Sequence, residues 1–464
     1  MLGLIQRLAR FLDRPAFPWK RLILGFSLAK YFFQGYLSLR QYSVLQQKKP
    51  PSVLRHEISQ EVFDKSQAYG RARAKFWLVN GIWNQLQNLA FYHFDLLPKL
   101  WEWSGRLLLD WAPQRFTGEV SQSIVFLLAT IVLNQLLSLP ASVYETFWLE
   151  AEFGFNKQTP QVFITDILKG QLLVFTIIPP VLAAFSAIIR RTNEHFFYYV
   201  WLFNAGLEAF LVTIFPTVIQ PLFNKLTPVE DGTLKSSAED LAKKLKFPLH
   251  ELFVIDGSRR SSHSNAYFFG LPWKKHIVIF DTLIEQSESE EVMAVLAHEL
   301  GHWSLGHTSR LFTIDQARSF YVFTLFSLFI NNNSLYASYG FQVKPMIVGY
   351  LLFRDALAPM GMIIKLLMNI LSRRYEFEAD SFARNLGYEE PLASSLIKMH
   401  KENLGTIDAD WMYANYHYSH PILSERLKAL DWQPTEKVEI VGSGEKGKER
   451  DGELAAVATG RDEL

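Results

Sequence analysis

The stretch EEVMAVLAHELGHWSLGH, residues 290–307, decides how the rest of the chain is interpreted. Its apolar residues recur at helical spacing, and the two glutamates at its start suit the positive end of a helix dipole. On such a helix His298 and His302 lie four residues apart on one face, so both imidazoles can bind a single Zn²⁺ ion. Glu299 lies beside them and can accept a proton from a water that the ion activates. The stretch therefore predicts a zinc-dependent hydrolytic site.

A third ligand must come from another histidine or a carboxylate, because the chain contains no cysteine. His307 follows His302 by five residues and, at about 100° per residue, would point about 140° away on a continuing helix. In RRYEFEAD, Glu376 and Asp380 are four residues apart and share a helix face, whereas Glu378 points to the opposite side. We predict Glu376 as the third ligand and Asp380 as the residue that orients a ligand histidine. A solvated acidic helix face is the alternative for this segment.

The composition is typical of a membrane protein that also has a sizeable polar part. Hydrophobic residues make up 49% of the 464 residues, charged residues 20%, and the mean hydropathy is +0.04. The net charge of +1 gives no indication of nucleic-acid binding. Apolar stretches long enough to cross a bilayer recur, and we predict seven spans. The predicted spans are residues 18–39, 76–98, 121–143, 167–189, 196–223, 311–331 and 346–370.

Charged residues lie inside four of these predicted spans. Because charges are costly in lipid, they usually face a bundle interior or water, which predicts an enclosed polar space between the helices. The alternative is that some lie at span ends and extend to the membrane surface. The residues are Lys30, Glu208, Arg318, Arg354, Asp355 and Lys365.

The chain divides into five predicted parts. Residues 233–246 are predicted to be helical, residues 252–256 and 276–280 to be strands, and residues 257–275 to be a flexible polar segment. A helical segment is predicted from residue 371 to 405. The parts are spans one to five (1–223), a cytosol-facing segment with the HExxH motif (224–310), spans six and seven (311–370), the rest of the catalytic domain (371–432) and a disordered tail (433–464).

The loop between the first two spans is rich in lysine and arginine, whereas the third loop is not. By the positive-inside rule this first loop is cytosolic, which places the N-terminus in the lumen and the C-terminus in the cytosol. The chain ends in RDEL, which resembles a lumenal retrieval signal, but on this topology no lumenal receptor could bind it.

Several motifs together make the chain resemble the type I CAAX prenyl proteases, multi-spanning zinc enzymes that include the a-factor converting enzyme. The resemblance extends from about residue 13 to 430. The motifs are EFGFNKQT (152–159), PLFNKLTP (221–228), GSRRSSHSNAYF (257–268), FDTL (280–283), VLAHELGHW (295–303), SRRYEFEAD (372–380) and HYSHP (417–421).

The resemblance implies a mainly α fold, in which about seven transmembrane helices enclose a large chamber beside a zincin-like domain with a small β element. It implies one Zn²⁺ per chain with Glu376 as the third ligand, and roles for Asn265, His420 and Arg426 in stabilising the oxyanion or positioning the substrate. Turn and surface ion-pair roles are the alternatives for Asn265 and Arg426.

The resemblance also implies that the substrates are prenylated proteins ending in CAAX, cleaved after the modified cysteine, with a second upstream cleavage in some precursors. The expected setting is the endoplasmic reticulum membrane, with the inner nuclear membrane as a second location, and a monomer in the lipid bilayer without nucleic acid.

We further predict that the HIVIF strand binds the substrate as an extended partner along its edge, with an ordinary buried strand as the alternative. This strand comprises His276, Ile277, Val278, Ile279 and Phe280. Two other functions are open: a site-2-type intramembrane zinc protease, in which the motif lies within an apolar span, and a non-enzymatic zinc transporter, in which Glu299 has no catalytic purpose.

Overall fold

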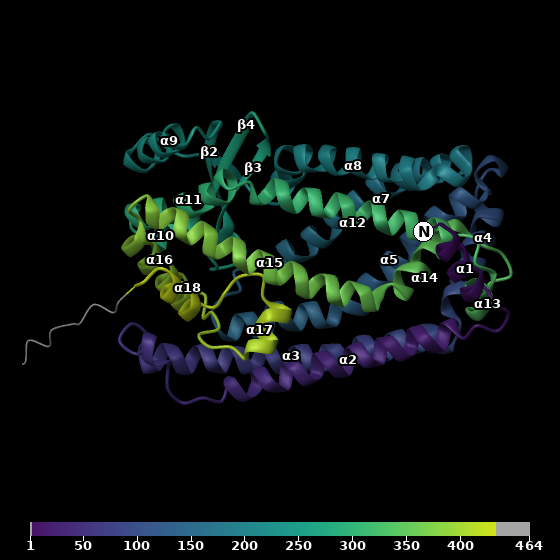
Figure 1. Ribbon diagram of the computed structural model, residues 1–464, viewed down its shortest axis with the longest axis horizontal. Coiled ribbons are helices and arrows are strands. Elements are labelled where there is room, and N and C mark those ends of the chain that lie inside the picture. Colours follow the sequence, from purple (N-terminus) through teal and green to yellow (C-terminus); the bar gives the residue numbers. More distant parts are fainter. Residues whose placement is uncertain (1, 433–464) are drawn as a thin grey trace, which may run out of the picture. The chain divides into compact units, whose positions relative to one another are not determined.

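The computed structural model describes residues 2–432, apart from the side chains of residues 2–6 and 194. The predicted tail, residues 433–464, and its RDEL end lie outside the described residues. Long helices and one small sheet make up the described chain (Figure 1). The long helices are α2 (Trp19–Val44), α3 (Gln60–His93), α5 (Glu119–Tyr144), α7 (Pro160–Thr192), α8 (Phe196–Ile214), α12 (His307–Phe329) and α15 (Ala358–Asn385).

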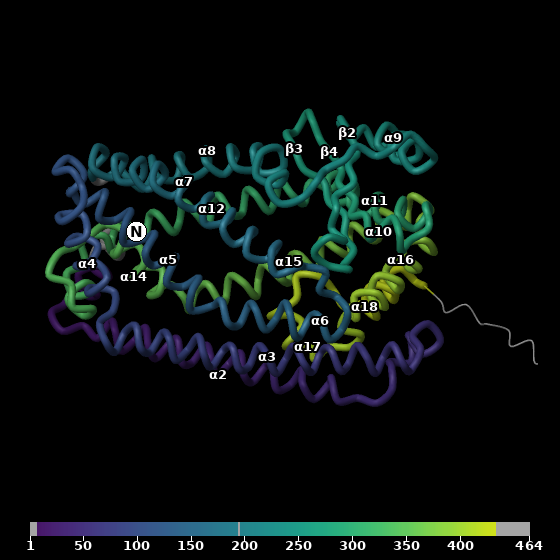
Figure 2. Tube along the Cα trace, turned by 180° about the vertical axis from the view of Figure 1, so that it is seen from behind, coloured from purple at the N-terminus to yellow at the C-terminus, as the bar shows by residue number. Residues whose placement is uncertain are grey.

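The helices close into a ring of contacts. Proceeding around it, α2 packs on α3, α3 on α4 (Leu96–Trp111), α4 on α5, and then α7, α8 and α12 follow. Helix α14 (Met346–Ala356) connects α12 to α15, and α15 returns to α2. The two opposite views agree on this neighbourhood (Figure 2). Each of the seven predicted spans falls largely on a long helix or, for residues 346–370, on the pair formed by α14 and α15.

The apolar composition of the helices varies around the ring. Three helical segments of the described chain are long and apolar enough to cross a membrane, or four if α14 and α15 form one bent span. Helices α2, α3 and α12 are less apolar, but their 26, 34 and 23 residues each extend farther than the ~30 Å hydrocarbon core. The prediction of a mainly helical, multi-spanning membrane protein is confirmed. The three segments are Glu119–Glu152, Pro160–Thr192 and Phe196–Leu222.

A polar cavity of about 620 Å³ lies between α2, α8, α12, α14 and α15, and it explains the weaker hydropathy of some helices. All six charged residues predicted inside spans line it, which confirms the predicted polar space. Two of the carboxylates are also hydrogen-bonded: Asp355 accepts from the Tyr92 hydroxyl at 2.7 Å, and Glu208 from the Asn204 amide at 2.7 Å.

Helix α15 connects the membrane-spanning helices to the part of the chain that carries Glu376. A bend of 60° at Leu357 separates it from α14, so the predicted span 346–370 is not one straight helix. Pro359 in the first turn of α15 explains the break, because proline starts helices but cannot continue them. Beyond the bend α15 runs without interruption through residue 370 and ends at Asn385, followed by Gly387 with φ of +91°. The predicted helix 371–405 is therefore the end of α15 followed by α16 (Glu389–Glu402).

The sheet has four strands in the order β1-β2-β4-β3. Strand β4 pairs in parallel with β2 and antiparallel with β3, so both of its edges are occupied. The prediction that residues 276–280 offer an edge to a substrate is therefore wrong. The strands are β1 (Leu226–Pro228), β2 (Leu249–Ile255), β3 (Ala266–Leu271) and β4 (Lys274–Phe280), which confirms the two predicted strands.

Strand β3 comes from the segment that we predicted to be flexible. Gly270 has φ of +112°, and a Cβ there would lie 2.3 Å from the carbonyl oxygen of Lys274, so the tight turn into β4 requires glycine. This turn folds residues 266–271 back onto β4. Among the described strands, β3 is one of the two at the edges of the sheet, and it begins directly after Asn265.

Several shorter helices lie among these elements, and α9, α10 and α11 pack against the sheet. Helix α9 confirms the predicted helix 233–246. The helices are α9 (Thr233–Leu245), α10 (Asp281–Gln286), α11 (Ser289–Ser304), α17 (Trp411–His417) and α18 (Leu423–Ala429), with α1 (Leu2–Leu12), α6 (Glu150–Glu152) and α13 (Asn333–Ser338) elsewhere.

Candidate metal centre

Helix α11 carries the HELGH motif and is held on nearly all sides. Val292, Leu296 and Leu300 are at most 1% exposed and belong to a core shared with α9, α16 and the sheet. Its start is fixed by the Glu291 carboxylate, which accepts a hydrogen bond from the Glu288 backbone N–H at 2.8 Å. This packing leaves the face that carries the two motif histidines pointing into a cavity.

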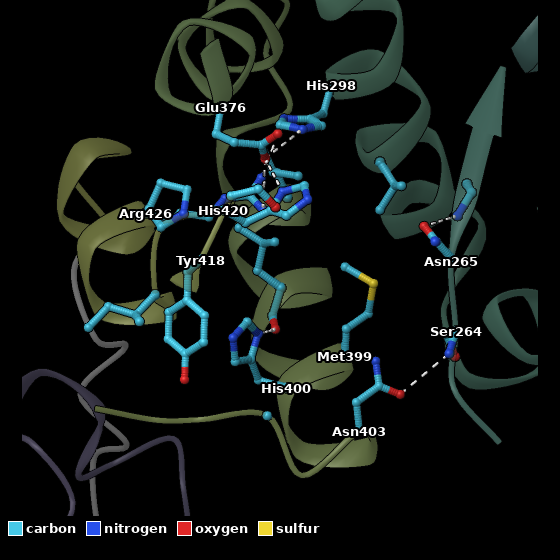
Figure 3. A pocket seen from close by; sticks show the side chains of 18 of the residues that line it. Ser264, Asn265, His298, Glu376, Met399, His400, Asn403, Tyr418, His420 and Arg426 are labelled. Carbon is cyan, nitrogen blue, oxygen red and sulfur yellow. Dashed lines mark hydrogen bonds and ion pairs between the residues drawn. The ribbon is translucent and has the colours of Figure 1, made fainter. Parts of the chain in front are cut away.

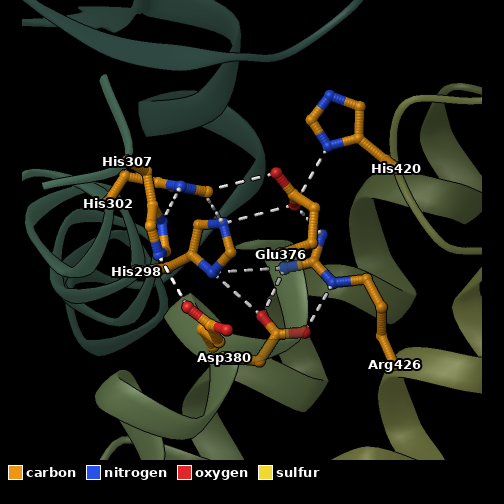
Figure 4. A network of polar contacts seen from close by, with 8 residues as sticks. His298, His302, His307, Glu376, Asp380, His420 and Arg426 are labelled. Carbon is orange, nitrogen blue, oxygen red and sulfur yellow. Dashed lines mark hydrogen bonds and ion pairs between the residues drawn. The ribbon is translucent and has the colours of Figure 1, made fainter. Parts of the chain in front are cut away.

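Three predicted ligands meet in that cavity. The Nε2 atoms of His298 and His302 are 3.2 Å apart, and they lie 3.5 and 3.3 Å from the two carboxylate oxygens of Glu376 (Figure 4). Glu376 comes from α15, so the site joins ligands from two helices that are more than 70 residues apart in sequence. The predicted set of two histidines and one distant carboxylate is thus brought together.

The chemistry of these atoms fits a zinc ion. One ligand atom from each of the three residues lies within 4.8 Å of the others, and two imidazoles with a carboxylate are a donor set that zinc takes in hydrolases. Glu376 Oε2 is buried and makes no well-aligned hydrogen bond, although His420 Nδ1 lies 2.9 Å away. Two imidazole nitrogens and carboxylate oxygens packed this closely are better explained by a shared cation than by contacts among themselves.

Asp380 lies where we predicted it, behind His298. Its Oδ1 accepts a hydrogen bond from His298 Nδ1 at 2.9 Å, and Arg426 donates to both of its oxygens at 2.9 and 2.5 Å. Asp380 is 1% exposed and Arg426 8%. Burial raises the pKa of Asp380, but Arg426 and His298 outweigh it and hold the pKa below its usual range. The carboxylate is therefore ionised and fixes the orientation of the His298 ring.

His307 is not where helical extrapolation placed it. Helix α11 ends at Ser304, and Gly306 adopts φ of +71°, so the chain turns before His307 opens α12. The turn returns His307 to His302, with their Nδ1 atoms 3.0 Å apart. His307 Nε2 lies 3.1 Å from Glu378 Oε2, so the residue that we expected to point away supports a ligand from behind.

Glu299 is half-buried and lines the same cavity as the three ligands. Burial raises the pKa of its carboxyl above the ordinary value, which increases its tendency to take up a proton near neutral pH. Among the described residues this side chain makes no hydrogen bond to a protein group, so its oxygens are available to a water or a substrate.

The cavity has a volume of about 620 Å³ and a mixed lining (Figure 3). Leu392, Leu396 and Met399 of α16 form an apolar wall. The His420 side chain is 67% exposed and lies beside Glu376. Asn265 lines the same cavity from the start of β3. Its Oδ1 accepts a hydrogen bond from the Ala266 backbone N–H at 2.8 Å, and within residues 2–432 its Nδ2 donates to no protein group. The structure thus brings His420 and Arg426 to the ligands, whereas Asn265 lines the same cavity on the side facing them (Figure 3).

The loop before Asn265, residues 257–264, is held in place by contacts that we did not predict from the sequence. Arg260 forms a two-pronged ion pair with Asp166 at 2.9 and 3.1 Å, and its carbonyl accepts from the Lys157 N–H at 3.1 Å. Phe155 packs on the His263 ring with centroids 4.4 Å apart. Arg260 therefore ties the loop to α7, and the EFGFNKQT segment holds the same loop through Lys157 and Phe155; no local pattern in these segments indicates the contacts.

Comparison with known proteins gives concordant matches over nearly the whole chain. Residues 41–225 match the family model described as CAAX prenyl protease N-terminal, five membrane helices, and residues 228–433 match peptidase family M48. CAAX prenyl protease 1 of Saccharomyces cerevisiae is 43% identical over 448 residues, covering 93% of this chain and 99% of the relative. The human CAAX prenyl protease 1 homolog is 37% identical, covering 88% and 94%. The crystal structure of S. mikatae Ste24p superposes with a TM-score of 0.86 at 42% identity, over 90% of this chain and 100% of that one.

Proposed function

This chain belongs to the CAAX prenyl protease family of membrane metallopeptidases, and from that premise we propose that it is a zinc endopeptidase that removes the last three residues of prenylated CAAX proteins. We propose a second, upstream cleavage for some precursors. The observation that carries the proposal is the convergence of His298, His302 and Glu376 in a cavity that Glu299 also lines. The names of the relatives, CAAX prenyl protease 1 and its homolog, supply the substrate class.

The residues divide the chemical work between them. A zinc ion bound by the three ligands would polarise the scissile carbonyl and make water a good nucleophile at neutral pH. Glu299 accepts the proton of the attacking water and then donates it to the leaving amine nitrogen. Asn265 and His420 are the donors that we assign to the developing oxyanion, since both line the cavity that holds the ligands. Arg426 acts through Asp380 and so positions His298.

The first test is hydrolysis by the purified protein in lipid nanodiscs. A farnesylated peptide ending in CAAX should lose its last three residues, a zinc chelator should abolish this cleavage, and added zinc should restore it. Mass spectrometry identifies the products, and the same peptide without the prenyl group is the control.

Two outcomes would contradict the proposal. Zinc transport across a bilayer without hydrolysis would favour a transporter. Cleavage only of membrane-spanning helices would favour an intramembrane protease, although α11 is not among the segments apolar enough to span a bilayer.

We also propose that the chain lies in the endoplasmic reticulum membrane, with the N-terminus in the lumen and the C-terminus in the cytosol. The basic loop around residues 40–75 supports this topology. In sealed microsomes, a C-terminal tag should be removed by added protease and an N-terminal tag should be protected. A protected C-terminal tag would reverse the topology and make RDEL accessible to a lumenal receptor.

A further inference from the structure

His307 is a fully buried histidine that the hydrolytic chemistry does not use directly. It is 1% exposed, and its two ring nitrogens face two different groups: Nδ1 lies 3.0 Å from His302 Nδ1 (Figure 4), and Nε2 lies 3.1 Å from Glu378 Oε2. Its ring stacks on Tyr375 with centroids 4.1 Å apart and planes 6° from parallel. The His307 ring is therefore held by polar contacts at both nitrogens and by stacking on one face.

The direction of the hydrogen bonds follows from the ligand at one end of this chain. His302 turns Nε2 toward Glu376 and His298, so a bound metal takes the Nε2 lone pair and the ring proton must be on Nδ1. That N–H donates to His307 Nδ1, which must accept and hence carries its own proton on Nε2. The Nε2–H then donates to Glu378, whose carboxylate can only accept. Ionised Glu378 thus favours one tautomer in each of the two rings.

The same helix that supplies the third ligand also holds this chain of hydrogen bonds. Tyr375, Glu376 and Glu378 are all on α15. Tyr375 and Glu378 both contact His307, while Glu376 is the third ligand of the proposed zinc site. The other Glu378 oxygen accepts from Arg374 Nε at 2.9 Å. His307 itself opens α12, so α11, α12 and α15 are connected behind one ligand.

We propose that His307 and Glu378 are positioning residues that orient His302 and set its tautomer for metal binding, as Asp380 does for His298. This inference rests on the proposed zinc site. The competing explanation is that His307 is only a packed core residue. The two differ because a packing role depends on ring shape, whereas a positioning role depends on an acceptor at the Nδ1 position.

The test measures zinc affinity by chelator competition in the full-length protein, and thermal stability of the metal-free form. His307→Phe keeps the ring and its stacking on Tyr375 but has no acceptor, and we expect zinc to bind about 10–100-fold more weakly. His307→Asn restores an acceptor oxygen near Nδ1 and should recover much of that loss. Glu378→Ala changes a side chain at the edge of the site, 33% exposed, and should weaken zinc binding several-fold even if the His307 variants fold poorly.

His276→Phe is the matched control, because His276 also stacks on an aromatic ring, that of Phe269, but lies in β4 away from the ligands. Its zinc affinity should equal that of the wild type. The inference is overturned if His307→Phe and Glu378→Ala bind zinc like the wild type, or if His307→Asn is no better than His307→Phe. A wild-type chain that binds no stoichiometric zinc would instead overturn the proposed function.

Discussion

Replacing Glu299 with glutamine should lower kcat for the prenylated peptide by a factor of about 10²–10⁴, with zinc content unchanged. Glutamine has nearly the shape of glutamate but cannot accept and return a proton. Since Glu299 is not one of the three ligands that converge, its replacement should leave the metal in place. Steady-state hydrolysis, metal analysis and thermal stability of one preparation test all three expectations.

Two other cavity residues provide the comparison. Asn265→Ala and His420→Ala remove donors that we assign to the oxyanion, and each should lower kcat by about 10²–10³ without loss of zinc. These variants retain a general base, so a small residual rate should remain that still depends on Glu299. Normal turnover by Glu299→Gln with zinc bound would disprove the role of this carboxylate as the base.

Local periodicity predicted the parts of the site that lie on single helices. His298 and His302 on α11, and Glu376 and Asp380 on α15, are pairs with i, i+4 spacing, and each pair shares a helix face in the structure. The same reasoning failed for His307 because it assumed that α11 continued. The signal was present in Gly306, since glycine commonly follows the end of a helix in the left-handed conformation.

The order of strands in the sheet could not be predicted from local patterns. HIVIF is an apolar run that suits either a central or an edge strand, and only its pairing with both β2 and β3 decides between them. The ion pair between Arg260 and Asp166 is a similar case, because 94 residues separate its partners. By contrast, charged residues within apolar spans predicted the polar cavity correctly, because the cost of a charge in lipid does not depend on the details of the fold.

Replacing Arg426 with methionine should destabilise the protein more than most single substitutions. The change leaves the Asp380 carboxylate, which is 1% exposed, with His298 as its remaining charged or polar partner. Breaking a buried ion pair in this way costs about 3–5 kcal/mol, because one charge stays buried without compensation. We expect the apparent Tm of the protein in detergent to fall by roughly 5 °C or more.

The double variant Arg426→Met with Asp380→Leu separates stability from metal binding. With both charges removed, an apolar pair of similar volume fills the site, so most of the lost thermal stability should return. Zinc affinity should not return, because His298 Nδ1 no longer has the acceptor that orients its ring, and a loss of about 10–100-fold is expected. If the double variant recovered wild-type zinc affinity, Asp380 would be a structural partner of Arg426 alone. If Arg426→Met were as stable as the wild type, the buried pair would contribute nothing that water or a neighbouring group could not replace.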